Sequence, residues 1–179
     1  MTEDKIYWYV LSCRTGSEKK VVESLKVFGG SDRYSPFIPQ KECIFRRKGE
    51  KTTFQKICFP GYVFIESGKP AAEFIAYIYP VVYKLKDAYR FLYNGDRSDI
   101  AMREEERIAL QYMLGHDKRI DISIGFKEGD SIRVTSGTLV GNESKILSIN
   151  KSRHEVVICV SMFGSLVPVS VGFEIIEKI

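Results

Sequence analysis

Hydrophobic and polar positions in the first part of the chain alternate between strand-like and helix-like patterns. Ile6–Ser12 is rich in aromatic and β-branched residues and predicts a strand. Apolar residues then recur at helical spacing up to Gly29 and Gly30, which predicts a helix that ends at this glycine pair. Thr15 and Glu18 have the spacing of a capping box, so Thr15 is expected to cap this helix.

The pattern continues with two further helices and several short strands. Pro70–Tyr79 fits a helix with proline near its start, and Ala101–Leu114 is amphipathic with three glutamates near its positive end. The other segments predict strands: Cys43–Phe45, Gln55–Phe59, Tyr62–Glu66, Val81–Lys86 and Arg90–Tyr93. Pro60 and Gly61 interrupt the most apolar stretch, although both residue types are unfavourable inside a strand. A mixed domain of helices and strands, α/β or α+β, is expected to end near Gly115.

The pattern changes in the last third of the chain. From Gly129 to Ile179 there is no helical period, and short strands recur between turn-forming residues. The expected strands are Ser131–Val134, Lys145–Ile149, Val156–Val160, Val167–Val169 and Glu174–Ile179. About five short strands in about fifty residues are typical of a small barrel. We therefore expect two domains, residues 1–115 and 127–179.

The segment between the expected domains, residues 116–126, does not have the composition of a flexible linker. Ile120, Ile122, Ile124 and Phe126 alternate with polar residues, which is the pattern of a half-buried strand. We expect these side chains to pack and to hold the barrel in place.

Composition narrows the class of protein. The chain has 179 residues, 44% of them hydrophobic, and a net charge of +4, which is compatible with nucleic-acid contact but not diagnostic of it. Its four cysteines are scattered and only two histidines accompany them, so free thiols are expected rather than a zinc site or disulfides. The polar start Met1–Lys5 and the lack of an apolar run near the ~20 residues of a membrane span predict a soluble, cytoplasmic protein. We also expect it to be a monomer.

Catalytic motifs are missing from the sequence. Neither His116 nor His154 lies in a recognisable nucleophile setting, and there is no phosphate-binding loop or dinucleotide fingerprint. The sequence therefore predicts a protein that is not an enzyme and that needs no cofactor or metal.

The second domain carries a specific motif. Gly129-Asp130 is followed by a strand, a glycine turn at Gly137, the apolar Leu139 and a second glycine turn at Gly141. This order resembles the KOW motif of NusG-type transcription factors and of certain ribosomal proteins. The continuation "VVICVSMFGSLVPVSVGFEIIEKI" is similar to the NusG KOW domain up to its last strand.

The first domain resembles the same family. "WYVLSCRTGSEKKVVESL" is similar to the opening of the NusG N-terminal domain, and "FPGYVFIE" matches a segment of that domain. Pro39, Glu42 and Pro80 also stand where the family has these residues. The resemblance implies an α+β protein: a NusG N-terminal (NGN) α/β sandwich-type domain, residues 1–115, then a connecting segment, residues 116–126, and a small SH3-like KOW β-barrel, residues 127–179.

The resemblance implies a contact with RNA polymerase. In NusG-like proteins the FPGY segment helps to form a hydrophobic depression that receives the clamp helices of the polymerase. The residues that match this site or adjoin it are Trp8, Tyr9, Phe59, Pro60 and Tyr62. Exposed aromatic side chains at a re-aimed turn suit an interface, whereas the alternative is that some of these rings belong to the core.

The resemblance also implies a contact with DNA. Residues 46–51 form the densest positive cluster in the chain, and in this family the corresponding hairpin approaches upstream DNA. The candidate residues are Arg14, Arg46, Arg47 and Lys48. An ordinary solvated hairpin is the alternative.

The details "CRTGSEKKVVESLK", "IFRRKGEK" and "FPGYVFIES" resemble the specialised NusG paralogs called LoaP. That subfamily implies processive antitermination and recognition of a leader RNA hairpin by the KOW domain. The candidate RNA-binding residues are Arg133, Lys145, Lys151, Arg153 and His154. The alternatives are a housekeeping NusG that links RNA polymerase to Rho or the ribosome, and an RNA-binding or ribosome-assembly protein that uses the barrel alone.

Overall fold

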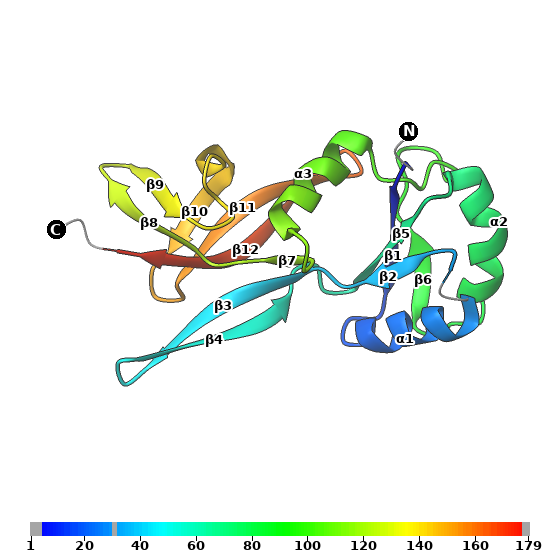
Figure 1. Cartoon of the computed structure of the whole chain (residues 1–179), viewed down its shortest axis with the longest axis horizontal. Helices are drawn as coiled ribbons and strands as arrows, with labels where there is room; N and C mark the ends of the chain where they lie inside the picture. The colour runs from blue at the N-terminus through cyan, green and yellow to red at the C-terminus, as the bar shows by residue number, and fades with distance from the viewer. Residues whose placement is uncertain (1–4, 30–31, 177–179) are drawn as a thin grey trace. The chain divides into compact units, whose positions relative to one another are not determined.

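The structure is a computed structural model that describes residues 5–29 and 32–176 (Figure 1). By its internal contacts the chain divides into two compact units. The first comprises the described residues of Met1–Ile38 together with Phe59–Ile108 and Met162–Gly164. The second comprises Pro39–Cys58, Ala109–Ser161 and the described residues of Ser165–Ile179. These units reflect packing, and the domain limits inferred from the sequence stay a prediction.

The first unit contains a four-stranded antiparallel sheet in the order β2-β5-β1-β6. Its strands are β1 (Tyr7–Cys13), β2 (Ser35–Phe37), β5 (Tyr62–Ser67) and β6 (Ala88–Phe91). Helices α1 (Glu18–Gly29) and α2 (Ala71–Val82) cover one face of this sheet, because Val21, Leu25, Phe74 and Ile78 share a buried core with side chains of β1 and β5. Alternate residues of a strand point to opposite faces. Tyr9 therefore lies on the helix side and Trp8 on the other side of the sheet.

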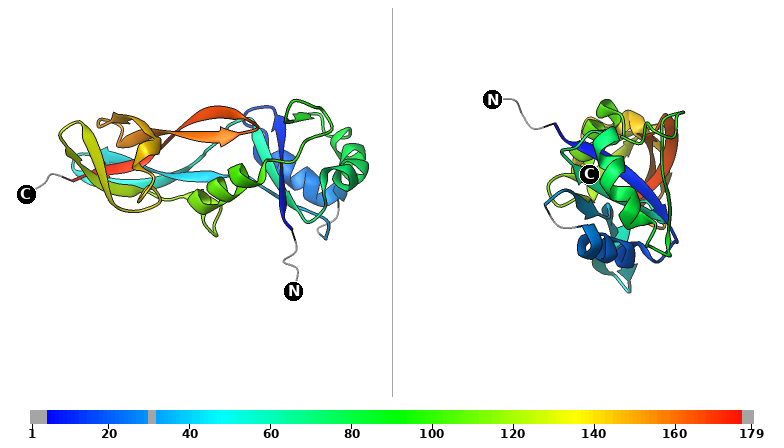
Figure 2. Two further views of the ribbon diagram at one scale, coloured as in Figure 1. Left: turned by 90° about the horizontal axis from the view of Figure 1, so that it is seen from above. Right: turned by 90° about the vertical axis from the view of Figure 1, so that its right-hand side faces the viewer.

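The second unit contains two sheets. A five-stranded sheet has the order β10-β11-β12-β8-β9, and a three-stranded sheet has the order β4-β3-β7. The strands are β3 (Gln40–Arg47), β4 (Glu50–Ile57), β7 (Arg119–Ile120), β8 (Ser123–Glu128), β9 (Ser131–Ser136), β10 (Ile146–Asn150), β11 (Glu155–Met162) and β12 (Ser165–Ile175). A short 3-10 helix, η1 (Glu143–Lys145), packs near β9, and β12 runs alongside β3 (Figures 1 and 2). The chain also forms helix α3 (Glu104–Leu114).

The connecting segment is strand-like, as its alternation indicates. β7 pairs in parallel with β3, and β8 pairs with β12 and β9. Ile120 is fully buried, whereas Ile122, Ile124 and Phe126 are half-buried. Ser123 is also fully buried, and its hydroxyl accepts the backbone N–H of Leu139 at 3.0 Å. The burial of Ser123 is therefore explained by a hydrogen bond that the apolar pattern did not indicate.

Helix α2 corrects the strand that was expected over Val81–Lys86. The helix continues through Pro80 to Val82, and residues beyond it form a turn rather than a strand. Val81 and Val82 are β-branched, which suggested a strand, but both are buried against the core of the first unit. Burial of Val81 and Val82 in the core has therefore outweighed their local preference for a strand.

Other boundaries also differ from the sequence-based expectation, among them the starts of two helices and the last strand. Helix α1 begins at Glu18, two residues after Gly16, so Thr15 does not cap it. Helix α3 begins at Glu104, because Ala101 instead forms an isolated bridge with Tyr9 of β1. The last two expected strands are one continuous strand, β12, and residues 177–179 of the expected segment lie outside the described residues.

In the described part of the chain, no helix has the length and the apolar character that crossing a membrane requires.

Candidate functional site

The interrupted apolar stretch is a tight turn between two strands. β4 ends at Ile57 and β5 begins at Tyr62, whose backbone N–H donates to the carbonyl of Phe59 at 3.2 Å. Pro60 is the second residue of this turn, and Gly61 is the third, with φ of +84°. A type II turn favours proline at the second position and requires positive φ at the third. The proline and glycine therefore specify the turn that re-aims the chain into β5.

A buried carboxylate holds this turn. Glu18 is only 2% exposed, and its Oε1 accepts the backbone N–H of Gly61 at 2.7 Å while its Oε2 accepts that of Gly16 at 2.9 Å. The carbonyl of Gly61 accepts the backbone N–H of Cys13 at 2.8 Å. A Cβ on Gly61 would lie 3.1 Å from Oγ1 of Thr15, so a side chain there has little room. Both polar groups of the Gly61 backbone are thus bonded, one to the last residue of β1 and the other to the first residue of α1.

The aromatic rings around the turn form a buried cluster. The ring of Trp8 packs edge-on against Phe37 and Phe64, with centroid distances of 5.1 and 6.2 Å, and Phe59 packs against Phe64 at 5.5 Å. Trp8 is fully buried and Phe59 is 3% exposed. The indole Nε1–H of Trp8 donates to Glu66 at 2.9 Å. In this conformation the rings of Trp8 and Phe59 are buried beside the turn, where both pack on Phe64, and they are not available to solvent.

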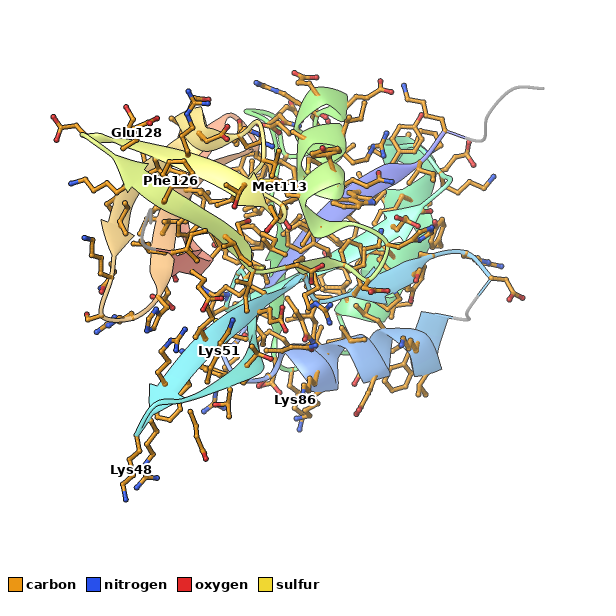
Figure 3. The ribbon with its side chains drawn as sticks, turned by 60° about the vertical axis from the view of Figure 1, so that its left-hand side comes forward. Lys48, Lys51, Lys86, Met113, Phe126 and Glu128 are labelled. Atoms are coloured by element: carbon orange, nitrogen blue, oxygen red, sulfur yellow. The ribbon has the colours of Figure 1, made fainter. Side chains whose placement is uncertain are left out.

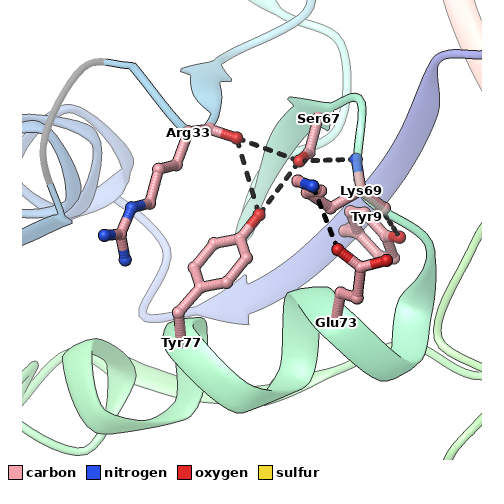
Figure 4. A network of polar contacts seen from close by, with 6 residues as sticks. All are labelled: Tyr9, Arg33, Ser67, Lys69, Glu73 and Tyr77. Carbon is pink, nitrogen blue, oxygen red and sulfur yellow. Dashed lines mark hydrogen bonds and ion pairs between the residues drawn. The ribbon is translucent and has the colours of Figure 1, made fainter.

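Tyr9 belongs to the core on the helix side of the sheet. Its ring stacks on Phe74 with a centroid distance of 3.9 Å, and its hydroxyl donates to the carbonyl of Lys69 at 2.6 Å (Figure 4). Burial raises the pKa of the Tyr9 hydroxyl far above its usual range. In the same region the hydroxyls of Ser67 and Tyr77 lie 3.0 Å apart, which connects β5 to α2. This network explains why Tyr9, which the sequence suggested as a contact residue, lies in the core.

Two residues of the turn remain accessible. Pro60 is exposed and Tyr62 is half-buried. The structure therefore separates the five residues singled out in the sequence into an accessible pair, Pro60 and Tyr62, and three buried rings.

The basic hairpin is formed by β3 and β4, which pair in register up to Arg47 and Glu50. Arg46 and Lys51 lie opposite each other, and both bond the carboxylate of Glu174 on β12, with 2.6 Å between Nη2 of Arg46 and Oε1 of Glu174. The hydrogen bond from Lys51 and the charges of Lys51 and Arg46 hold the pKa of Glu174 below its usual range. Lys48 lies at the tip of the hairpin, and its side chain points away from the strands (Figure 3).

The basic turn of the barrel, Lys151–His154, is held by Asn150. The amide oxygen of Asn150 accepts the hydroxyl of Ser152 at 2.8 Å and the backbone N–H of Arg153 at 3.1 Å. His154 has φ of +52°, and its carbonyl accepts the backbone N–H of Phe173 at 2.8 Å. The side chains of Lys151 and Arg153 are exposed, as a phosphate-binding turn requires.

The other candidate cations are more dispersed. Arg133 lies on edge strand β9 and pairs with Glu128 at 3.1 Å, whereas Lys145 is half-buried in η1. Arg14 is exposed in the first unit, directly after β1. The structure therefore groups Lys151, Arg153 and His154 in one turn but does not place Arg133 in it.

The cysteines are free thiols, as their spacing indicates. Burial raises the pKa of Cys13 to about 11 and that of Cys58 to about 12, and it also raises the pKa of Cys43. These thiols are therefore protonated at neutral pH. Among the described residues no group of three or more histidine, cysteine, aspartate or glutamate side chains could hold a metal ion.

Comparisons with known proteins identify the family of the chain. The family model described as "Transcription termination factor nusG" matches residues 6–111. The chain is 30% identical to the transcription termination/antitermination protein NusG of Thermus thermophilus, over 97% of this chain and 98% of that protein. It is 28% identical to the protein of the same name from Borreliella burgdorferi, over 96% of this chain and 98% of that protein.

The fold is also similar to a solved structure described as "Domain interaction in Thermotoga maritima NusG". The TM-score is 0.51, the sequence identity is 24%, and the match covers 94% of each chain. The mixed helices and strands are those of a NusG N-terminal domain and a KOW β-domain, as expected from the sequence. The chain belongs to the NusG family of transcription termination and antitermination factors.

Proposed function

We propose that this NusG-type factor is a transcription elongation factor that acts as a processive antiterminator. In this proposal the N-terminal domain binds the clamp helices of RNA polymerase, and the KOW domain binds a structured leader RNA. The observation that carries the proposal is the Phe59–Tyr62 turn, which presents an exposed proline and a half-buried tyrosine on a backbone fixed by Glu18. A rigid aromatic group on a fixed turn loses little conformational entropy on binding, which favours it as an interface anchor.

The roles of the five turn residues follow from their burial. Pro60 and Tyr62 are proposed to contact the clamp helices. Phe59 and Trp8 are proposed to support the turn through their packing on Phe64. Tyr9 is proposed to act only indirectly, by packing β1 against α2.

The polymerase contact is tested by pull-down of core RNA polymerase with the full chain. Tyr62→Ala is expected to weaken binding by about 10-fold or more, which corresponds to about 1.4 kcal/mol or more for an interface anchor. Tyr89→Ala is the matched control, since Tyr89 is a 63% exposed tyrosine on β6 of the same unit. Binding of folded Tyr62→Ala at the strength of the wild type would remove the proposed site.

The RNA contact is proposed for the Lys151–His154 turn, because its two exposed cations stand on a backbone that Asn150 orders. Arg133 and Lys145 are secondary candidates. A few placed donors predict a shallow salt dependence and a marked dependence on RNA structure. Lys151→Ala/Arg153→Ala is expected to lower affinity for the structured leader of the operon and to leave affinity for a scrambled leader unchanged. Equal loss for both RNAs would contradict structure-specific recognition by this turn.

The basic hairpin and Arg14 are proposed to approach the upstream DNA of the elongation complex. The accessible cations of the hairpin, Arg47 and Lys48, suit a contact with phosphates that carries no sequence information.

The alternative function is a housekeeping NusG that links RNA polymerase to Rho or the ribosome. It is favoured by the relatives that match nearly the whole chain, which carry the name of a termination/antitermination protein. Transcription in vitro across a terminator separates the two functions. An antiterminator is expected to give readthrough only on templates with the leader, whereas an adaptor is expected to change termination only when Rho is added.

A further inference from the structure

One face of β12 packs closely on the basic hairpin within the second unit. Ser170, Gly172 and Glu174 are alternate residues, so their side-chain positions share this face. Nζ of Lys41, on β3, donates to the carbonyl and the hydroxyl of Ser170 at 2.5 and 2.8 Å. A Cβ on Gly172 would lie only 2.5 Å from the carbonyl oxygen of Glu42. The backbones of β3 and β12 are thus in direct contact, which brings Glu174 to the hairpin.

Glu174 lies between the two cations of one cross-strand pair. Arg46 and Lys51 are paired in the register of the hairpin, and each donates to a different oxygen of the Glu174 carboxylate. The side chain of Glu174 is 15% exposed, whereas those of Arg46 and Lys51 are 41% and 37% exposed. The carboxylate therefore sits beneath the two cations and neutralises one charge of the pair.

The cations at the tip differ from this pair. Within the described part of the chain, neither Arg47 nor Lys48 pairs with a carboxylate, and both are exposed. Lys48 extends from the end of the hairpin in Figure 3. The positive cluster in the sequence therefore consists of two accessible cations and two that are already engaged.

Engaged and accessible cations contribute differently to the binding of a polyanion. A cation that contacts a phosphate releases a counterion from the nucleic acid, which gives the salt dependence of binding. A cation that is bonded to a carboxylate must first give up that partner, or the carboxylate remains near the phosphate and repels it. Surface ion pairs are weak, so this competition changes affinity without abolishing binding.

We propose that Glu174 restricts duplex DNA binding by the hairpin to the tip residues Arg47 and Lys48, by withholding Arg46 and Lys51 from phosphates. The inference rests on the proposed contact between the hairpin and DNA, and it adds an intramolecular carboxylate that sets the strength of this contact. Glu174 lies more than 120 residues after the hairpin cations that it bonds. A count of the cations in the hairpin sequence alone therefore overestimates how many are available to phosphates.

The test is titration of a mixed-sequence DNA duplex with the full chain over a series of salt concentrations. Each phosphate contact adds about 0.9 to the slope of log K against log salt. Glu174→Gln is expected to steepen this slope by about 2 and to raise affinity at low salt by about 10-fold, because two cations are freed. Asp121→Asn is the matched control, because it makes the same charge change and frees Arg119 in the same unit. It is expected to leave the slope unchanged.

A second variant shows whether the freed cations cause the gain. Adding Arg46→Ala and Lys51→Ala to Glu174→Gln is expected to abolish the gain, and thermal melts establish that each variant is folded. An equal gain for Glu174→Gln and Asp121→Asn, no gain for Glu174→Gln, or a gain that survives loss of both cations would each overturn the proposal.

The Arg47→Ala/Lys48→Ala variant distinguishes a failure of the role proposed for Glu174 from a failure of the proposed contact between the hairpin and DNA. If it binds the duplex as the wild type does, the hairpin is not the DNA site and the proposed contact fails. If it binds more weakly while Glu174→Gln behaves as the wild type, only the role of Glu174 is wrong.

Discussion

Two carboxylates, one in each unit, organise two of the three regions that the sequence marks as functional. Glu18 is buried and accepts two backbone N–H groups, one of them from the Phe59–Tyr62 turn. Glu174, whose side chain is 15% exposed, bonds two cationic side chains of the hairpin in the second unit. The first fixes the shape of a turn, and the second adjusts the charge of a surface.

The physical consequences of the two arrangements differ. Removal of a buried acceptor leaves buried donors unsatisfied, which costs about 1–3 kcal/mol for each donor. Removal of one partner from a surface ion pair costs about 0–1 kcal/mol. We therefore expect stability to depend on Glu18 and nucleic-acid affinity to depend on Glu174.

The largest effect is expected for Glu18→Ala. Loss of the acceptor for the buried N–H of Gly61 should cost about 1–3 kcal/mol, and loss of the bond to the partly buried N–H of Gly16 about 1 kcal/mol more, so the free energy of unfolding should fall by about 2–4 kcal/mol. Glu18→Gln retains one oxygen acceptor and should cost less. The measurement is urea unfolding followed by the fluorescence of Trp8, the single tryptophan, which lies in the first unit. Glu23→Ala on the exposed face of α1 is the control, and equal stability of the two alanine variants would contradict the account.

Gly61→Ala is expected to have the next largest effect. The residue has φ of +84°, and the added Cβ would lie 3.1 Å from Oγ1 of Thr15, so strain and crowding should together cost about 2 kcal/mol. Gly95→Ala provides the comparison, since Gly95 has φ of +73° with open space around it and should cost only about 1 kcal/mol. If the two substitutions cost the same in urea unfolding, close packing of the turn contributes nothing.

A smaller effect on stability is expected for Glu174→Gln. At pH 7 it should lower the free energy of unfolding by no more than about 1 kcal/mol. The pKa of Glu174 is lowered in the folded protein, so its contribution is fully present above the unfolded value of about 4.3 and is lost as the pH falls through the folded value. Thermal unfolding should therefore show a difference from the wild type at pH 7 that shrinks below about pH 4. A difference that is constant with pH would mean that the charge of Glu174 is not responsible.

The comparison also shows which features the sequence can predict. Strands β1 and β5 lie within about one residue of their expected bounds, because their apolar runs and turn residues are local signals. The turn type at Pro60 and Gly61 is equally local. The strand expected over Val81–Lys86 was wrong because burial of Val81 and Val82 against the core outweighed their β propensity.

The candidate sites were harder to predict because the exposure of a side chain depends on residues that are far away in the sequence. Glu18 bonds Gly61 across 43 positions, and Glu174 bonds Arg46 across 128. No periodicity or motif spacing reports such contacts. Tyr9 illustrates the same limit, since its place in a strand was predicted but the stacking on Phe74 that keeps it from the surface was not.

The central claim is that the Phe59–Tyr62 turn binds RNA polymerase and the basic hairpin binds DNA. It is tested most directly by measuring the affinity of one variant of each surface for each of these two partners. Tyr62→Ala and Arg47→Ala/Lys48→Ala are each titrated against core RNA polymerase and against a DNA duplex, and thermal melts verify that both variants are folded. Tyr62→Ala is expected to lose about 10-fold in affinity for polymerase and none for DNA, whereas Arg47→Ala/Lys48→Ala is expected to lose affinity for DNA and none for polymerase. A Tyr62→Ala protein that binds polymerase like the wild type, or a hairpin variant that keeps its affinity for DNA, would contradict the separation of the two surfaces.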